Sequence, residues 1–380
     1  MNTNIINCFK NRINKIFDER RGFSTNKNII VFESDDWGSI RMPSKEIYDL
    51  GIKKGYLFNE TLYDRFDSLE SDDDLTALFE TLYKYRNNND EHPIFTANTL
   101  VANPDFNKIE DSYFEKYYYE TVDKTFASYP NHSNSLKLWY QGQENKIFKL
   151  QYHGREHLNV KCYMLDLRKK KEDLLFCFNN RILGAINKNE NKPINKYVYA
   201  TKPIDKNDNQ EIIKILEDGI KLFTKLHGFN SVSFIYPNYI LNPEYEYKLH
   251  RLGVIIFQGD YIQRVPYNCS LKNVYHYLGE KNKIGQIYLV RNCSFEPTLE
   301  PGIDTVGKCL IQIEKAFKFN KPAIISTHRV NYIGFIDESN RKNNIEKLDK
   351  LLSIILKKWP DVEFMSSDKL GELIINEQVK

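Results

Sequence analysis

The chain has 380 residues, of which 41% are hydrophobic and 28% are charged, a balance typical of globular proteins rather than disordered or fibrous ones. Its 54 lysines and arginines nearly offset its 51 aspartates and glutamates, so the formal net charge is only +3. A nucleic acid is therefore not expected as the main partner, because nucleic-acid binders usually carry a basic surplus.

The first 25 residues place apolar side chains at helical spacing, with basic side chains between them. We expect residues 1–25 to form an amphipathic helix that packs on the main domain, with a helix resting on an anionic membrane surface as the alternative. No run of about 18 apolar residues predicts a transmembrane helix. The six cysteines form no C-x-x-C pair, which in a chain of this size is typical of reduced thiols in a cytoplasmic protein.

Short β-rich runs alternate with helical patterns through most of the chain. Strands are expected at 29–33, 93–97, 147–152, 232–236, 253–257, 286–290, 323–327 and 362–365. Helices are expected at 71–86, 155–178, 208–227 and 340–358. This alternation favours an α/β fold with a parallel sheet, open or closed into a barrel. Functional residues should then follow the carboxyl ends of the strands.

Two adjacent acidic residues, Asp35 and Asp36, follow the first expected strand, within the stretch 33–38 (ESDDWG). Neighbouring carboxylates at the end of a buried strand repel each other and lose solvation, which is costly without a cation nearby. One metal ligand and one general base would account for the pair. Two loop aspartates that cap a helix are the alternative.

Three histidines follow later strands. His153 and His157 have the H-x-x-x-H spacing, which in a helical turn puts both imidazoles on one face within reach of one ion, although such pairs also occur by chance. Together with one aspartate they would make three protein ligands and leave a position open for water, as in catalytic zinc sites. His328 comes directly after 323–327 and is a candidate general acid, with a structural histidine as the alternative.

In this order, the aspartate pair, the H-x-x-x-H motif and the late strand that ends in His328 resemble the polysaccharide deacetylase family, the NodB-homology or carbohydrate esterase family 4 group. The stretch 359–371 (WPDVEFMSSDKLG) is similar to the last strand and helix of such domains. The resemblance implies an α/β fold, an irregular (β/α) barrel with insertions. One such domain would span residues 28–380, with an insertion within about 40–150.

Carried over by position, the resemblance implies that Asp35 is the catalytic base and His328 the catalytic acid. Asp36, His153 and His157 would hold a divalent metal, with Zn²⁺ as the expected ion. The implied activity is removal of an N-acetyl group from a glycan or glycan precursor in surface polysaccharide biosynthesis. Two alternatives stay open: a metal- and glycan-binding protein of the same fold with altered catalysis, and a de-O-acylase.

The chain departs from the family at two motifs. The Arg-x-Pro-Tyr motif is matched by 235–238, which reads Ile-Tyr-Pro-Asn, so another arginine should orient the base. Arg155, Arg41 and Arg329 are the candidates for that role. The motif that supplies an acidic partner for the catalytic histidine has no clear match, and Asp260 and Asp304 are the candidates.

A further set of residues follows the expected strands and is interpreted as substrate-binding or supporting, with loop turns or core packing as the alternatives. The set comprises Trp37, Arg155, Pro237, Tyr239, Asn98, Arg291, Glu296 and Arg329. A backbone amide near Pro237 to Tyr239 would hold the oxyanion. The expected partner is a glycan or sugar conjugate in the cytoplasm, with peripheral membrane contact through the N-terminal helix as a further option.

Overall fold

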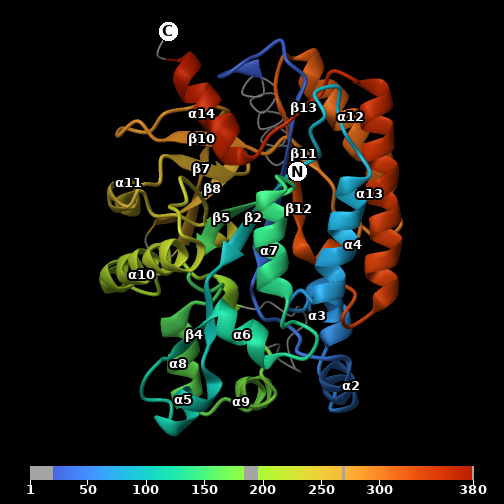
Figure 1. Ribbon diagram of the computed structural model, residues 1–380. Helices are drawn as coiled ribbons and strands as arrows, with labels where there is room; N and C mark the ends of the chain where they lie inside the picture. The colour runs from blue at the N-terminus through green and yellow to red at the C-terminus, as the bar shows by residue number, and fades with distance from the viewer. Residues whose placement is uncertain (1–19, 184–195, 268–269, 379–380) are drawn as a thin grey trace, which may run out of the picture.

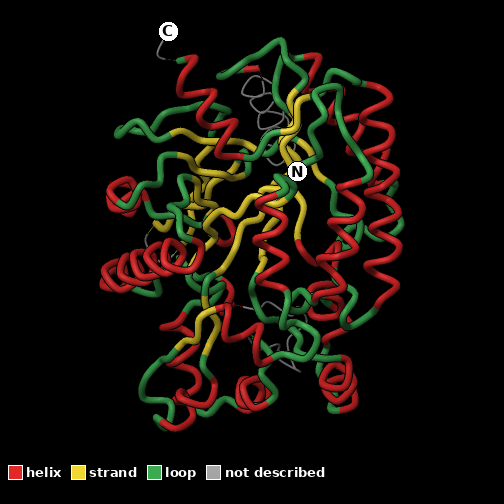
Figure 2. The backbone as a smooth tube through the Cα atoms, viewed as in Figure 1, coloured by secondary structure: helices red, strands yellow, loops and turns green. Residues whose placement is uncertain are grey.

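A computed structural model describes residues 20–183, 196–267 and 270–378. Strands gather in the centre of the molecule and helices surround them (Figures 1 and 2). The amphipathic helix expected at residues 1–25 falls almost entirely outside the described residues, so it stays a prediction. Among the helices that are described, none is both long and apolar enough to cross a membrane.

A mixed α/β fold is confirmed, with one large sheet whose strands all pair in parallel. Its strands are β1 (Ile29–Trp37), β2 (Phe95–Leu100), β5 (Phe148–Gly154), β6 (Ser233–Ile235), β7 (Ile256–Gly259), β10 (Ile287–Val290), β11 (Cys293–Ser294), β12 (Ala323–His328) and β13 (Glu363–Phe364). The strand order is β10-β7-β6-β5-β2-β1-β12-β11, with β13 paired to the start of β1. Each expected strand is present, with its ends shifted by a few residues.

The two ends of this strand order belong to one short run of chain. β10 and β11 are separated by only Arg291 and Asn292. The amide of Arg291 donates to Gly259 O of β7 at 2.9 Å, and the amide of Asn292 donates to Ile324 O of β12 at 3.1 Å. The run therefore bridges both edges of the sheet, and the strands form a barrel-like ring.

Two small antiparallel sheets and the helices complete the fold. β3 (Ala102–Pro104) pairs with β4 (Tyr119–Thr121), and β8 (Ile262–Tyr267) pairs with β9 (Ser270–Tyr275). The α-helices are α2 (Lys45–Lys53), α3 (Leu62–Phe66), α4 (Asp72–Tyr83), α5 (Phe106–Asp111), α6 (Val122–Ser128), α7 (Ser135–Glu144), α8 (Val160–Arg168), α9 (Glu172–Asn179), α10 (Asn209–His227), α11 (Glu246–Arg251), α12 (Thr305–Lys318), α13 (Glu338–Lys358) and α14 (Ser367–Glu377). Short 3₁₀ helices are η1 (Phe58–Glu60), η2 (Lys196–Val198), η3 (Lys206–Asp208), η4 (Pro237–Tyr239), η5 (Pro243–Tyr245) and η6 (Arg329–Tyr332).

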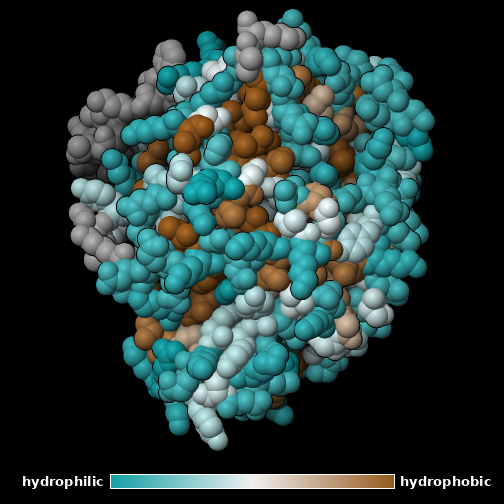
Figure 3. Space-filling view, turned by 60° about the vertical axis from the view of Figure 1, so that its left-hand side comes forward, coloured by the Kyte–Doolittle hydropathy of each residue, from teal (hydrophilic) through white to brown (hydrophobic). Residues whose placement is uncertain are grey.

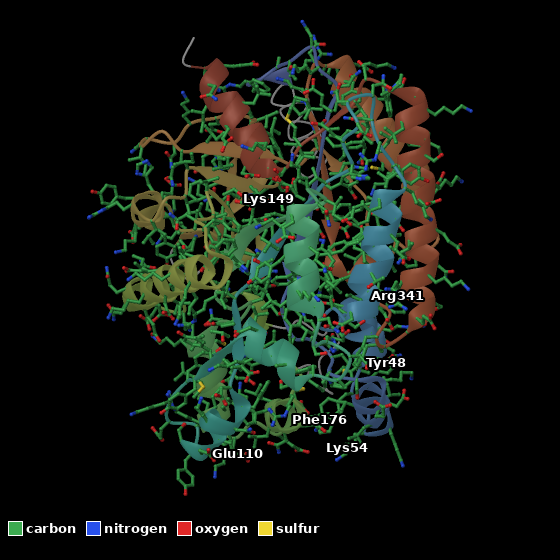
Figure 4. All side chains as sticks on the ribbon, in the orientation of Figure 1. Tyr48, Lys54, Glu110, Lys149, Phe176 and Arg341 are labelled. Carbon is green, nitrogen blue, oxygen red and sulfur yellow. The ribbon has the colours of Figure 1, made fainter. Side chains whose placement is uncertain are left out.

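The helix expected at 71–86 is α4, and local chemistry explains its start. Ser71 and Asp74 form a reciprocal capping box, which satisfies amides that the first turn leaves without partners. Asp74 also accepts Arg341 Nη1 at 2.8 Å, which ties α4 to α13 (Figure 4). The expected helices at 208–227 and 340–358 correspond to α10 and α13.

The helix expected at 155–178 is wrong in its first turn and in its continuity. Residues 155–159 form a loop, and two shorter helices, α8 and α9, follow it. A basic run at 168–171 separates these helices, and Lys170 there has a φ of 51°, which a helix does not allow. The H-x-x-x-H motif therefore lies on a strand end and a loop rather than on one helix.

The core has a large cluster of buried hydrophobic side chains within and around the ring and smaller clusters at its margins. One smaller cluster joins α5, α8 and α9, which lie with α6 and β4 beyond one end of the barrel (Figure 1). The face in Figure 3 is mostly hydrophilic, with hydrophobic residues in the hollows between polar ridges. The expected single domain at 28–380 and insertion within 40–150 stay predictions.

Candidate metal and catalytic site

The residues expected to form the site meet at one end of the parallel strands. Asp35 and Asp36 lie just before the last residue of β1, His153 is next to the last residue of β5, and His328 ends β12. Asp35 and His328 are direct partners in the register of β1 and β12. Because parallel strands present their carboxyl ends at one edge, the sequence order places these side chains together, as expected.

Asp35 and Asp36 both line one cavity of about 380 Å³, although consecutive strand residues normally point to opposite faces. The backbone of Asp36 has a φ of 76°, and the pairing of β1 with β2 shifts register between Ser34 and Trp37. This bulge turns the chain so that the second carboxylate also points into the cavity. A left-handed conformation costs about 1–2 kcal/mol for a residue with a Cβ, and such costs often mark functional sites.

Asp36, His153 and His157 form a buried cluster that could hold a metal. One ligand atom from each residue lies within 4.8 Å of the other two. Asp36 Oδ1 lies 3.3 Å from His153 Nε2 and 3.7 Å from His157 Nε2. One carboxylate oxygen and two imidazole nitrogens are the donor set of many catalytic zinc sites.

The surroundings of the two histidines fit a cation between them and Asp36. His153 Nδ1 lies 2.9 Å from Ile235 O, which can only accept, so Nδ1 carries a proton and Nε2, 3.3 Å from Asp36 Oδ1, is the atom placed to bind a cation. Burial lowers the pKa of His157 to about 3, so its imidazole is neutral near pH 7. Its Nδ1 is a buried atom without a hydrogen-bond partner among the described residues. Two imidazoles and a carboxylate that meet in a buried cluster match the ligand set of a divalent cation.

Asp35 is held from two sides. Arg291 donates from Nη1 to Asp35 Oδ2 at 2.8 Å and from Nη2 to Oδ1 at 2.7 Å. Asn98 Nδ2 donates to the same Oδ1 at 2.7 Å, as part of a hydrogen bond network that reaches Gln258 inside the barrel. Burial alone would raise the pKa of Asp35, but the charge and hydrogen bonds of Arg291 outweigh it and lower the pKa. Asp35 is therefore ionised and fixed in orientation.

The acidic partner of His328 is Glu296. His328 Nδ1 lies 2.7 Å from Glu296 Oε1, and Asn331 Nδ2 donates to the other oxygen of that carboxylate at 2.7 Å. The Nε2 of His328 points to the site, 3.7 Å from Asp35 Oδ2. Burial opposes the charged imidazole, but Glu296, together with Asp35 and Asp36, outweighs burial and raises the pKa of His328 to about 9.

The Pro237 to Tyr239 turn forms another wall of the cavity. Asn238 and Tyr239 have φ values of 56° and 55°, an uncommon left-handed pair outside glycine. Tyr239 Oη accepts Arg291 Nη1 at 3.0 Å, which connects this wall to the Asp35 carboxylate. The amide of Tyr239 already donates to Tyr236 O at 3.1 Å, so an oxyanion donor in this turn stays a prediction.

Several sequence predictions are corrected by the structure. Trp37 is fully buried, packs edge-on against Phe148 and does not line the cavity, so the core-packing alternative holds for it. Arg155 pairs with Glu156 at 2.6 Å and does not reach Asp35. Its role is in the backbone: the main-chain carbonyl of Arg155 accepts the amides of Val101 and Ala102, which holds the loop at 155–159.

Arg329 and Arg41 are also not the partners of Asp35. Arg329 is completely buried and forms ion pairs with Asp67 at 3.0 Å and Glu70 at 2.8 Å. Arg41 lies 3.5 Å from Asp36, the neighbouring carboxylate. Both arginines follow expected strands, but their side chains also reach the loop between α3 and α4, where both contact Asp67.

Neither expected partner of His328 contacts it. Asp304 caps the start of α12 by accepting the amide of Gly307 at 3.0 Å. Asp260 lines a separate cavity and accepts the amide of Tyr261 at 2.6 Å. The sequence placed Arg291 and Glu296 near the site but not in these roles. Their signal is a polar pair after the buried strand 286–290, which the closure of the barrel brings to Asp35 and His328.

Comparisons with known proteins give structural likenesses at low sequence identity. No protein-family model and no curated protein matches the sequence. A putative polysaccharide deacetylase from Mycobacterium smegmatis is 9% identical, with 94% of each chain covered and a TM-score of 0.45. A putative glycoside hydrolase/deacetylase from Parabacteroides distasonis is 9% identical, with 93% of this chain and 72% of that chain covered and a TM-score of 0.46.

A third similar structure is a GH57 branching enzyme from Thermococcus kodakaraensis, 11% identical, with 90% of this chain and 70% of that chain covered and a TM-score of 0.45. These proteins are described by different activities. Neither the fold nor the activity of this chain is inferred from them, because the identities and TM-scores are too low. The chemistry of the site therefore stands on its own residues.

Proposed function

We propose that the protein is a metal-dependent hydrolase that removes an N-acetyl group from a glycan or glycan precursor. The observation that carries the proposal is that the Asp36–His153–His157 cluster shares one cavity with Asp35 and His328. A three-residue metal site, an ionised carboxylate and a charged histidine are the groups that hydrolysis of an amide needs.

Asp36, His153 and His157 would hold the metal. When bound, a divalent metal supplies Lewis acidity, which polarises a carbonyl oxygen and makes water easier to deprotonate. The neutral imidazole of His157 is ready to act as a ligand, because burial disfavours its protonated form. His153 is held in the tautomer that leaves Nε2 free by its bond to Ile235 O.

Asp35 would accept a proton from the attacking water. Its Oδ1 already accepts both Asn98 and Arg291, whereas Oδ2 accepts Arg291 and faces His328. Because Oδ1 already accepts two hydrogen bonds, Oδ2 is the oxygen of Asp35 with the more available lone pair for a proton in the cavity. A carboxylate fixed in this way loses little orientational freedom when the reaction begins.

His328 would donate a proton to the departing nitrogen. An amine is a poor leaving group unless it is protonated, and Glu296 keeps the imidazolium form available near neutral pH. This favours N-acyl over O-acyl substrates, because an alcohol needs less help to depart. The alternative of a protein with altered catalysis rested on the missing arginine and tyrosine of the Arg-x-Pro-Tyr motif. Arg291 lies beside Asp35, where an orienting arginine is needed, whereas Asn238 still stands in the place of the tyrosine.

We also propose that the partner is a glycan or sugar conjugate, which is in keeping with the small net charge. We place this partner in the cytoplasm. Contact of residues 1–25 with a membrane surface belongs to the same proposal. It concerns a segment that falls mostly outside the described residues.

The test is an acetate-release assay over N-acetylated and O-acetylated sugars, with metal content measured on the same sample. We expect release from N-acetyl substrates that is lost after chelation and restored by Zn²⁺ or another divalent metal. O-acetyl substrates should be hydrolysed more slowly. No release from any substrate by metal-loaded protein, or release that survives complete metal removal, would contradict the proposal.

A further inference from the structure

Three arginines lie in or against the candidate cavity, and two of them are matched by carboxylates. Arg291 pairs with Asp35 at 2.7 Å, and Arg41 lies 3.5 Å from Asp36. The third, Arg264, lines the same cavity from β8. The positive charge of Arg264 therefore decides which ligand charge the cavity favours.

Arg264 has no acidic partner in the part of the chain that the structure describes, where no carboxylate lies within 4.0 Å of its guanidinium. The side chain is half-buried and donates from Nη2 to the main-chain carbonyl of Asn238. A guanidinium has five N–H donors, so most of them stay available to a ligand. Half-buried cations without a counter-ion are costly, which favours an anion supplied by the ligand.

The backbone around Arg264 is held in place before any ligand binds. Its carbonyl accepts the amide of Leu241 at 3.1 Å, and the neighbouring Gln263 Nε2 donates to Leu241 O at 3.1 Å. Gln263 in turn lies 2.8 Å from His276 Nε2. The β8–β9 hairpin is thus fixed to the segment that forms the cavity wall, which lowers the entropy lost when Arg264 binds an anion.

The rest of the lining suits a sugar beside that anion. Tyr63, Tyr199 and Tyr239 line the cavity and supply aromatic rings with polar hydroxyls that a sugar could contact. Asp64 also lines it. Its carboxylate accepts the hydroxyl of Thr61 at the start of α3, and burial raises its pKa to about 6, so it stays ionised near pH 7. Among the described residues it does not come within 4.0 Å of the Arg264 guanidinium, so Arg264 keeps no counter-ion on its own wall.

We propose that the substrate is an acylated sugar carrying an anionic group, a phosphate or a carboxylate, that is received by Arg264. This deepens the proposed function and rests on it. The planar guanidinium of an arginine can donate two parallel hydrogen bonds to a phosphate or to a carboxylate, so the same site would bind either group.

The test compares three substrates: N-acetylglucosamine, its 1-phosphate and N-acetylmuramic acid, which carries a carboxylate. In the unaltered protein we expect the anionic substrates to have the higher kcat/KM, and the better of the two identifies the source of the anion. Arg264→Gln should raise the KM of that substrate about tenfold or more, since a lost charge-assisted hydrogen bond weakens binding by about that factor. It should leave kcat and the neutral substrate nearly unchanged.

Two further variants control the result. Lys272→Gln removes the same charge from the other strand of the hairpin, at an exposed position that does not line the cavity, and should not change KM. Arg264→Lys should restore part of the affinity for the anion. Equal use of neutral and anionic substrates, or an equal loss for all three in Arg264→Gln, would overturn the inference and assign Arg264 to holding the Asn238 turn.

A binding measurement separates this inference from the proposed function. Calorimetric titration with glucosamine 1-phosphate needs no turnover. If no acetate is released from any sugar but this binding depends on Arg264, the anion site stands and the proposed hydrolysis fails. If acetate release depends on metal but Arg264→Gln binds the phosphate as well as the unaltered protein does, the hydrolysis stands and the anion site fails.

Discussion

At the scale of single residues, the candidate site is a set of buried charges that each have a specific partner. Asp35 is matched by Arg291, Asp36 by Arg41 and the two histidines, and His328 by Glu296. Buried charges are tolerated only when they are paired and hydrogen-bonded, because desolvation costs several kcal/mol for each ion. The pairing explains why these charges persist in the interior, and why two arginines and a glutamate matter as much as the residues expected to react.

The Glu296–His328 pair predicts a specific pH dependence. The folded-state pKa of His328 is about 9, above its ordinary value of 6.5, so the charged pair contributes its full stability below about pH 6.5 and loses it as pH rises through about 9. If His328 donates a proton, kcat/KM should fall on the alkaline side over the same range. Glu296→Gln removes the carboxylate and should move that fall to lower pH by more than one unit.

The measurement is the pH profile of kcat/KM, together with NMR titration of the His328 ring. Glu280→Gln is the matched control, because Glu280 lies 3.0 Å from the ring of another buried histidine, His276, away from the cavity. The control should leave the alkaline limb where it is. An unchanged limb in Glu296→Gln would remove His328 from the role of acid.

At the scale of elements, the H-x-x-x-H motif shows what spacing can predict. The spacing of His153 and His157 correctly indicated that both reach one ion, yet the element it suggested, a helical turn, is absent. The strand β5 continues to Gly154, whose φ of 145° lets the chain leave the strand, and the carbonyl of Arg155 accepts the amides of Val101 and Ala102. A loop held by long-range hydrogen bonds leaves no periodic signal in the sequence.

The close packing of helix α10 on β5 leads to a prediction about the free energy of unfolding. Gly219 faces β5, and a Cβ there would lie 2.1 Å from Tyr152 Oη and 2.9 Å from Arg155 Cβ. Alanine favours a helix interior by about 1 kcal/mol over glycine, but the clash must be relieved by moving α10 or Tyr152. We expect Gly219→Ala to lower the free energy of unfolding by about 1–3 kcal/mol.

Urea unfolding checks this prediction. Lys221→Ala, at an exposed position of the same helix, should change stability by no more than about 0.5 kcal/mol. Equal or greater stability in Gly219→Ala would mean that the contact between α10 and β5 is looser than the structure has it.

At the scale of the whole molecule, closure of the barrel creates the complete site. The run between β10 and β11 brings Arg291 to Asp35, and the segment that follows β11 places Glu296 beside His328. From the sequence, the parallel α/β architecture could be predicted, because strand patterns are local. The convergence of Asp35, Asp36, His153, His157 and His328 could be predicted because the residues follow the carboxyl ends of parallel strands. The partners could not be assigned, because they depend on which two edges of the sheet meet.

The hydrogen bonds of Asn292 lead to a prediction about the stability of this closure. Its amide donates to Ile324 O at 3.1 Å, its Oδ1 accepts the Ile324 amide at 2.8 Å, and its Nδ2 donates to Pro322 O at 2.8 Å. The side chain thus takes the place of a missing strand pairing. Asn292→Ala should leave the buried Ile324 amide without a partner and cost about 1–3 kcal/mol.

Hydrogen–deuterium exchange at Ile324 measures that loss directly. Exchange there should become faster in Asn292→Ala, whereas amides of β2 and β5 across the barrel should change less. Asn343→Ala, at an exposed position on α13, is the control and should leave the exchange of Ile324 unchanged. Unchanged protection in Asn292→Ala would mean that the ring is not closed through this side chain.

The central claim is that Asp36, His153 and His157 hold a metal while Asp35 acts beside it without holding it. The most direct test is to measure metal stoichiometry and acetate release on the same preparations of Asp36→Ala and Asp35→Asn. We expect Asp36→Ala to lose both metal and activity, whereas Asp35→Asn should retain about one equivalent of metal and lose activity. One equivalent of metal and normal turnover in Asp36→Ala would contradict it.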